Sequence, residues 1–277
     1  MVIILFLLLG LVVGSFLNVV IIRHKEKGIG GRSGCMSCRE QLAAQDLIPV
    51  FSWVYLRGRC RQCGSRVSVQ YPLVEASVAI LFAGMIYGLM LSPTFDPSSI
   101  YSLVTLGIGL VIICLLVMIT TYDIRHTIIP DSWSYGFAIA ALFWTLSVYG
   151  FTLTVLYWAV VAALVCALPF AALWLVSGGR WMGLGDAKLA LGIGALLGIT
   201  DGFTSLLIAF WGGAGVSIVF LILLPRLVKM LGLKKFLRLR NFSLKSEVAF
   251  GPFLVFGCIL VWYMNLYGLP LHILNFV

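Results

Sequence analysis

The sequence predicts an all-α polytopic membrane protein of about eight transmembrane helices, with a small zinc-binding cytoplasmic domain inserted between helices 1 and 2. Three observations support this prediction: the hydrophobicity of the chain, the placement of its charges and two pairs of cysteines. Of the 277 residues, 61% are hydrophobic and only 10% are charged, and the mean hydropathy is +1.09. Soluble domains are about 45–50% apolar and about 25% charged. The excess apolar surface therefore requires lipid around it.

Stretches without Asp, Glu, Lys or Arg mark the candidate membrane spans. A helix needs about 20 apolar residues to cross the bilayer core. The run 132–179 is long enough for two spans, divided near 149–152, whereas the run 189–200 is short and rich in glycine and alanine. The first segment lacks the charged start of a signal peptide, so we expect it to remain as a helix. The remaining candidate segments are 1–22, 76–95, 97–122, 202–225 and 248–277.

Lysine and arginine occur only in alternate loops of this arrangement. The loops 23–72, 122–131, 177–188 and 225–247 together hold all 19 of these residues. Because Lys and Arg concentrate on the cytoplasmic side of membrane proteins, we predict that these loops are cytoplasmic and that both termini lie on the outer side. The net charge of +9 is then explained by topology and by contact with anionic membrane lipid. We expect no nucleic-acid partner.

The loop 23–72 contains two C-x-x-C pairs, Cys35 with Cys38 and Cys60 with Cys63. Four thiolates can complete the tetrahedral shell of a structural Zn²⁺, and a domain this small needs such a staple to fold. The alternative is two disulfides, which rarely persist in the cytoplasm. The predicted domains are therefore a first transmembrane helix, a four-cysteine zinc-binding domain and a seven-helix membrane domain, over 1–22, 23–72 and 73–277.

Two aspartates stand at predicted cytoplasmic ends of spans. Asp123 lies in "TTYDIRHTIIPD" at the end of the third span, and Asp186 lies in "GLGDAKL" at the start of the sixth. Two carboxylates at one depth can share a proton and a water molecule. The ionised one activates the water while the protonated one donates to a scissile carbonyl, which is the chemistry of an aspartic peptidase. The glycines before Asp186 would let an extended substrate strand approach the acid.

The same acids have simpler structural interpretations. Asp186 could cap the helix that follows it, and Asp123 could pair with Arg125 or bond to the local backbone. If both are catalytic, helix dipoles favour Asp186 as the base and Asp123 as the acid that carries the proton. Two other functions remain as alternatives, a proton-coupled transporter and a membrane-anchored zinc module without catalysis. Acids near the interface and the lack of an internal repeat favour the peptidase.

Taken together, the motifs resemble those of the type IV prepilin peptidase family over nearly the whole chain. "MGLGDAKL" is similar to the G-x-G-D block of that family, and Ala249 stands where the family often has proline. The matching motifs are "GSFLNVVIIR" (14–23), "LRGRC" (56–60), "YPLVE" (71–75), "YDIRHTIIPD" (122–131), "MGLGDAKL" (182–189) and "FGPFL" (250–254).

The resemblance implies an intramembrane aspartic endopeptidase of the bacterial inner membrane, with Asp123 and Asp186 as the catalytic pair at the cytoplasmic face. Its substrates would be prepilins or pseudopilins of type IV pilus or type II secretion systems, which lose a short basic leader. Many members also N-methylate the new N-terminus with S-adenosyl-L-methionine, and the zinc-type loop is commonly linked with this bifunctional form. Four further positions in the motifs are expected to support the motifs or the substrate: Gly183, Gly185, Lys188 and Glu75.

Overall fold

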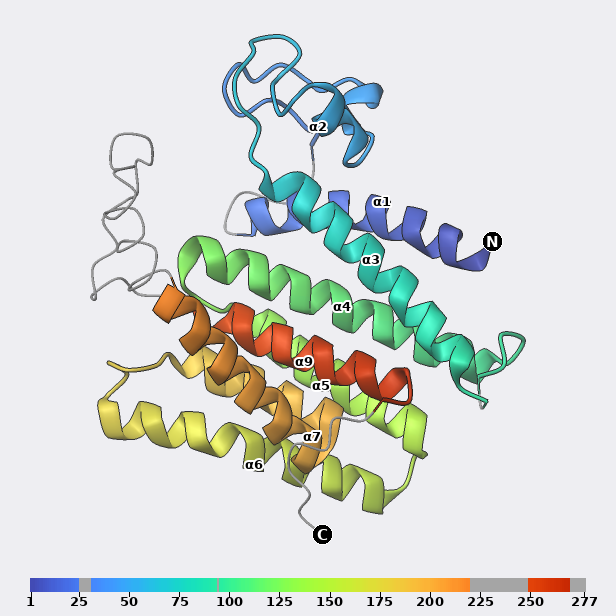
Figure 1. Cartoon of the computed structure of the whole chain (residues 1–277), viewed down its shortest axis with the longest axis vertical. Helices are drawn as coiled ribbons and strands as arrows, with labels where there is room; N and C mark the ends of the chain where they lie inside the picture. Colours follow the sequence, from blue (N-terminus) through green and yellow to red (C-terminus); the bar gives the residue numbers. More distant parts are fainter. Residues whose placement is uncertain (25–30, 94, 220–248, 270–277) are drawn as a thin grey trace. The chain divides into compact units, whose positions relative to one another are not determined.

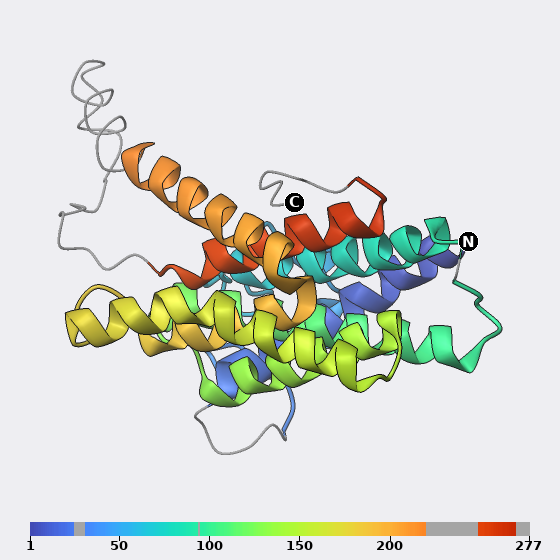
Figure 2. The ribbon, with the colours of Figure 1, turned by 90° about the horizontal axis from the view of Figure 1, so that it is seen from below.

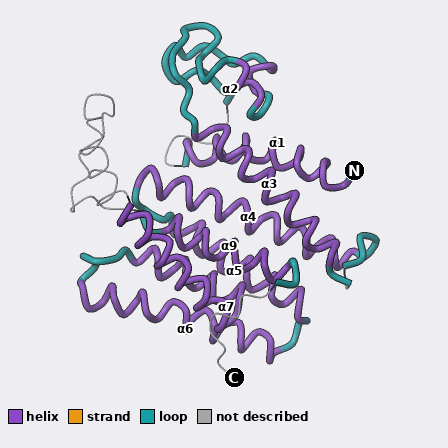
Figure 3. The backbone as a smooth tube through the Cα atoms, viewed as in Figure 1, coloured by secondary structure: helices purple, strands orange, loops and turns teal. Residues whose placement is uncertain are grey.

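The computed structural model describes residues 1–24, 31–93, 95–219 and 249–269 (Figure 1). Within these ranges the regular structure is helical, and no named strand is formed (Figure 3). Two isolated bridges are the exception, and both lie in the cysteine-containing loop. The predicted all-α class is therefore confirmed. The basic loop predicted over 225–247 lies outside the described residues.

Two compact units make up the chain, Met1–Thr121 and Tyr122–Val277. The first unit contains α1 (Val2–Arg23), α3 (Gln70–Leu91) and most of α4 (Ile100–His126). Between α1 and α3 the cysteine-containing loop forms only a 3-10 turn, η1 (Ala44–Leu47), and the short helix α2 (Phe51–Tyr55).

Glycines allow α1 to lie directly against the backbone of α3. A Cβ atom added at Gly10 would lie 2.5 Å from the Cα of Ala79, and one at Gly14 would lie 2.7 Å from the Cα of Glu75. The two glycines are four residues apart and so occupy the same face of α1. This is the small-residue spacing by which membrane helices approach each other closely. The pairing fixes where α3 places Glu75.

The second unit contains the end of α4 and four further described helices: α5 (Asp131–Tyr149), α6 (Leu153–Ser177), α7 (Leu184–Ile218) and α9 (Gly251–Leu266). α7 changes direction at Gly198, whose backbone is not helical (φ 79°, ψ −172°), and Figure 2 shows the bend. The sequence predicts two spans here, 187–200 and 202–225. The structure joins their described parts into one element with a break close to the predicted boundary.

Five described helices are long and apolar enough to cross a membrane, namely α1, α3, α4, α6 and α7. α9 is apolar but shorter, with 16 residues, and α5 has 19. Against about eight predicted spans, the described residues therefore contain five candidate spans and two further helices, α5 and α9. The chain is thus a multi-pass membrane protein.

Candidate active site and metal centre

The second unit brings Asp123 and Asp186 together although they are far apart in the sequence. Asp123 lies in the last turn of α4, and Asp186 lies in the first turn of α7. Their exposed fractions are only 4% and 8%, and the two carboxylates are close enough to interact electrostatically. Two buried, neighbouring carboxyl groups can hold a single shared proton, because repulsion disfavours ionisation of both.

The simpler interpretations account for these acids only in part. The N-cap of α7 is Gly183, and the carboxylate of Asp186, three residues further on, accepts a hydrogen bond from the backbone of Gly183, so Asp186 does contribute to capping α7. The two ion pairs formed among the described residues include neither Asp123 nor Asp186. Neither carboxylate is therefore neutralised by a cationic side chain in the described part of the chain.

The start of α9 provides a contact to Asp123 that the sequence analysis did not predict. The backbone N–H of Gly251 donates a hydrogen bond to Oδ2 of Asp123 over 3.0 Å. A Cβ atom at position 251 would lie 2.6 Å from the same oxygen, so only glycine fits without displacement. Gly251 belongs to the "FGPFL" motif at 250–254. In the sequence, the feature that could have indicated this contact is a glycine directly before a proline at the start of a helix.

This contact also removes the basis for assigning the proton by helix ends. Asp123 does lie at the C-terminal end of α4, but its carboxylate also meets the N-terminal end of α9. Asp186 lies at the N-terminal end of α7. Both acids thus lie near a helix N-terminus, where an anion is favoured, and the dipole argument no longer distinguishes them.

Ile129, in the loop between α4 and α5, packs against both helix starts. It is 8% exposed, and its Cβ would lie 3.0 Å from a Cβ atom at Gly185. Its Cδ1 would lie 3.2 Å from a Cβ atom at Gly251. Gly183 has no comparable neighbour, because its nearest contact would be at 3.9 Å. Of the two predicted glycines, Gly185 is required for close packing beside the acids, whereas Gly183 has free space.

Lys188 forms an ion pair between the starts of α7 and α5. Its Nζ lies 2.6 Å from Oδ1 of Asp131, the first residue of α5, and 5.5 Å from the centre of the Tyr135 ring. The Lys188 side chain is mostly buried, with 16% exposed, while that of Asp131 is 64% exposed. This pair links the helix that contains Asp186 to the loop that follows Asp123.

In the first unit, the four cysteines of the loop converge as predicted. The Sγ atoms of Cys35, Cys38, Cys60 and Cys63 all lie within 4.8 Å of one another, and all four are free thiols. The Sγ atoms of Cys35 and Cys63 are 3.8 Å apart. Zn–S bonds of about 2.3 Å in a tetrahedron separate the sulfurs by about that distance. The cluster could therefore hold a metal ion such as Zn²⁺.

Each of the two cysteine pairs lies on its own backbone turn, and the two turns have the same hydrogen-bonding pattern. Cys35 and Cys60 each donate their N–H to the carbonyl five residues later, over 2.9 and 2.8 Å. The residue after the second cysteine of each pair has a left-handed backbone, at Arg39 (φ 60°) and Gly64 (φ 69°). Hydrogen bonds from the backbone at Cys38 and Ser37 lower the pKa of the Cys35 thiol to about 6. The thiolate is the form that binds metal.

Glu75 connects this loop to the membrane helices of the first unit. It is buried, with 6% exposed, and its Oε2 accepts the N–H of Val50 over 2.7 Å. Val50 has φ 62° and ψ −51°, and the N–H of Phe51 donates to the carbonyl of Pro49 over 2.6 Å. This is a γ-turn of the rare, strained kind, at a β-branched residue. A buried carboxylate thus holds a strained turn of the cysteine loop.

Replacing Glu75 with leucine is expected to loosen the cysteine loop. The amide of Val50 would lose its buried acceptor, which costs about 1–3 kcal/mol. Thermal unfolding in detergent and limited proteolysis of the loop would measure the change. Glu75→Gln is the matched control, because its amide oxygen still accepts the hydrogen bond and should retain most of the stability. Equal proteolysis of the wild type and Glu75→Leu would contradict the role given to this contact.

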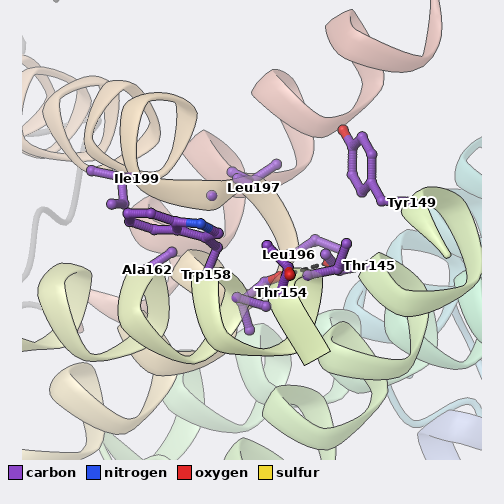
Figure 4. A pocket seen from close by; sticks show the side chains of 12 residues that line it. Thr145, Tyr149, Thr154, Trp158, Ala162, Leu196, Leu197 and Ile199 are labelled. Carbon is purple, nitrogen blue, oxygen red and sulfur yellow. Dashed lines mark hydrogen bonds between the residues drawn. The ribbon is translucent and has the colours of Figure 1, made fainter. Parts of the chain in front are cut away.

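A groove of about 380 Å³ lies elsewhere in the second unit, beside the break at Gly198 (Figure 4). Its lining includes Thr145, Tyr149, Thr154 and Trp158, but no acid, histidine or cysteine. It therefore has no carboxylate, imidazole or thiol for catalysis or metal binding, and the aspartate pair is the better candidate for the active site.

A multi-pass helical membrane protein with a buried aspartate pair at two helix ends belongs by its architecture to the class of intramembrane aspartic peptidases. Comparison with known families agrees: residues 8–89 match the bacterial peptidase A24 N-terminal domain, and residues 110–233 match the type IV leader peptidase family. The chain belongs to the type IV leader peptidase family, as its motifs had indicated.

Two relatives with equal sequence identity to this chain align with almost its whole length. A protein of Pectobacterium carotovorum subsp. carotovorum is 31% identical over 94% of this chain and 92% of its own length. One of Pseudomonas putida is 31% identical over 97% of this chain and 93% of its own. Both are named prepilin leader peptidase/N-methyltransferase. No solved structure matches the chain significantly.

Proposed function

We propose that this protein is a membrane-embedded aspartic endopeptidase that removes the leader peptide of type IV prepilins or pseudopilins, and that it also N-methylates the new N-terminus. The observation that supports the peptidase most directly is the meeting of Asp123 and Asp186, both buried, at the ends of two helices. The family and the names of the relatives supply the substrate class.

In the proposed reaction the aspartates share one proton and hold one water molecule. The ionised carboxylate removes a proton from the water as its oxygen attacks the carbonyl carbon of the scissile peptide. The protonated carboxyl group donates its proton to the carbonyl oxygen, giving a tetrahedral intermediate. The aspartate that took the proton from water then donates it to the leaving nitrogen as the C–N bond breaks. The other aspartate takes back a proton from a hydroxyl of the collapsing intermediate, so the pair again holds a single proton.

We further propose that the four cysteines hold a structural Zn²⁺ and that the cysteine loop and the acid pair face the cytoplasm at the bacterial inner membrane. The positions of all 19 Lys and Arg residues support this orientation. The sulfur separation in the cluster fits the metal. Methylation would use S-adenosyl-L-methionine as donor. The groove of Figure 4 does not fit that donor, because no charged residue lines it.

Purified protein in detergent, incubated with a prepilin and S-adenosyl-L-methionine, tests the proposal directly. Mass spectrometry of the product is expected to show loss of the leader and addition of one methyl group at the new N-terminus. A second incubation without the methyl donor should give cleavage alone. An intact prepilin after incubation with folded protein would refute the peptidase, whereas cleavage without methylation in both incubations would refute only the methyltransferase.

The ion pair of Lys188 and Asp131 is expected to matter more for catalysis than for stability. The Asp131 partner of this pair is 64% exposed, and ion pairs that water can reach contribute about 0.2–1 kcal/mol to folding. A small displacement of Asp186 relative to Asp123 can slow the reaction far more. We expect Lys188→Met to lower kcat about tenfold with little change in Tm. Restoring the pair in reverse, with Lys188→Asp and Asp131→Lys together, should recover part of kcat, and no recovery would exclude a positioning role for the pair.

A further inference from the structure

The structure contains a third component beside the two aspartates, at the N-terminal end of α9. The N–H of Gly251 is among the first amides of this helix, which have no partner inside the helix itself. It donates to Oδ2 of Asp123 over 3.0 Å, and the contact is buried. No other hydrogen bond to this carboxylate occurs among the described residues. One oxygen is therefore held, and Oδ1 is left for a water molecule or a proton.

Resting on the proposed peptidase function, we propose that Gly251 is a positioning residue: its backbone amide holds Oδ2 of Asp123 so that Oδ1 faces the water and the shared proton. The absence of a side chain is what permits the contact. A Cβ atom at this position would lie 2.6 Å from Oδ2 and 3.2 Å from Cδ1 of Ile129. Ile129 in turn packs on Gly185, next to Asp186.

The start of α9 is itself fixed by aromatic packing. The ring of Phe250 lies 5.0 Å from that of Phe210 in α7 and 6.3 Å from that of Phe170 in α6. Phe253, one turn further into α9, lies 6.3 Å from Phe250. Aromatic pairs at these distances are favourable beyond the area they bury.

The "FGPF" run therefore has a separate physical role for each part. The phenylalanines anchor the end of the helix, the proline favours helix initiation, and the glycine lets the first amide reach Asp123. This packing holds the N-terminus of α9 at a fixed place relative to Asp123. The hydrogen bond between Gly251 and Asp123 is thereby maintained by the packing of the second unit.

Gly251→Ala tests the positioning role. We expect kcat for leader removal to fall about 100-fold, with KM changed less than about threefold, because the carboxylate is displaced while the remaining substrate contacts stay. Gly213→Ala, in α7, is the matched control, because its added methyl group would meet only ordinary contacts at 3.5 Å from Phe250 and Phe253. This control should keep wild-type kinetics.

A readout independent of activity is the infrared absorption of the Asp123 carboxyl group, assigned by its disappearance in Asp123→Asn. The band should shift in Gly251→Ala and stay in place in Gly213→Ala. Should Gly251→Ala fail to fold, Phe250→Leu loosens the anchor without a clash, and it should shift the band and lower kcat about tenfold. An unshifted band with wild-type kcat in the folded variants would overturn the inference and leave the peptidase proposal intact. Failure of the wild type to cleave would refute the peptidase, while the band would still report the contact.

Discussion

Replacement of either Asp123 or Asp186 with asparagine is expected to abolish leader removal. Asparagine keeps the shape of the side chain but can neither accept the proton of the water nor donate an acidic proton to the carbonyl oxygen. General acid–base catalysis is worth about 10²–10⁴-fold per group, so the rate should fall by about 10³-fold or more. Mass spectrometry of a prepilin incubated with each purified variant measures the loss.

Stability should respond in the opposite direction. Both carboxyl groups are buried, and the pair with one shared proton carries one buried negative charge. When one acid becomes a neutral amide, the other can stay protonated, so that unfavourable buried charge is lost. We therefore expect each asparagine variant to unfold at a temperature no lower than the wild type, which would separate a catalytic loss from a folding defect. Asp201→Asn is the control on α7, the helix that contains Asp186. Asp201 lies beyond Gly198, and its Oδ2 accepts a hydrogen bond from Nδ2 of Asn265 over 2.7 Å. It should cleave normally.

The double variant gives a further check on the shared-proton mechanism. Two groups that act as one unit lose nearly all of their effect when either is removed. Asp123→Asn with Asp186→Asn should therefore be about as slow as each single variant. Substantial cleavage by either single variant, or losses that multiply in the double variant, would argue that the aspartates do not work as a pair.

Loss of the metal is expected to unfold the cysteine loop while the membrane helices remain. The loop has little hydrophobic core of its own, and Cys60 is the most buried of the four cysteines, with 8% exposed. In a domain of this kind the free energy of metal binding supplies much of the free energy of folding. Cys60→Ser should therefore lose bound zinc and make the loop sensitive to protease, with helical circular dichroism nearly unchanged.

Elemental analysis of the purified protein should give one zinc ion per chain for the wild type and much less for Cys60→Ser. Cys114→Ser is the matched control, because Cys114 lies within α4 and takes no part in the cluster. Full zinc content and normal protease resistance in Cys60→Ser would exclude the four-cysteine site. Resistance that survives chelation but not a thiol reductant would instead support disulfides.

Local features of the sequence were enough to predict most of the helices. Long charge-free runs predicted α1, α3, α4 and α6 because crossing a bilayer requires about 20 apolar residues. The cysteine spacing predicted the cluster, since two C-x-x-C turns present two sulfurs each. The charged residue Asp201 divided the region after α6 into two predicted spans, and the structure instead has one element, α7, with a non-helical residue, Gly198, close to that boundary.

What the sequence determined by itself was therefore the identity of the segments and of the acids and thiols, since composition, spacing and charge are properties of neighbouring residues. Only the tertiary structure decided the contacts between distant segments: the amide of Gly251 on Asp123, Ile129 against Gly185, and the strained turn at Val50 on Glu75. Each contact depends on which faces of two segments meet. It also depends on a distance between them that must be right to within a few tenths of an ångström. Glycine, isoleucine and valine do not by themselves predict such contacts in a sequence, because their role arises from the space around them.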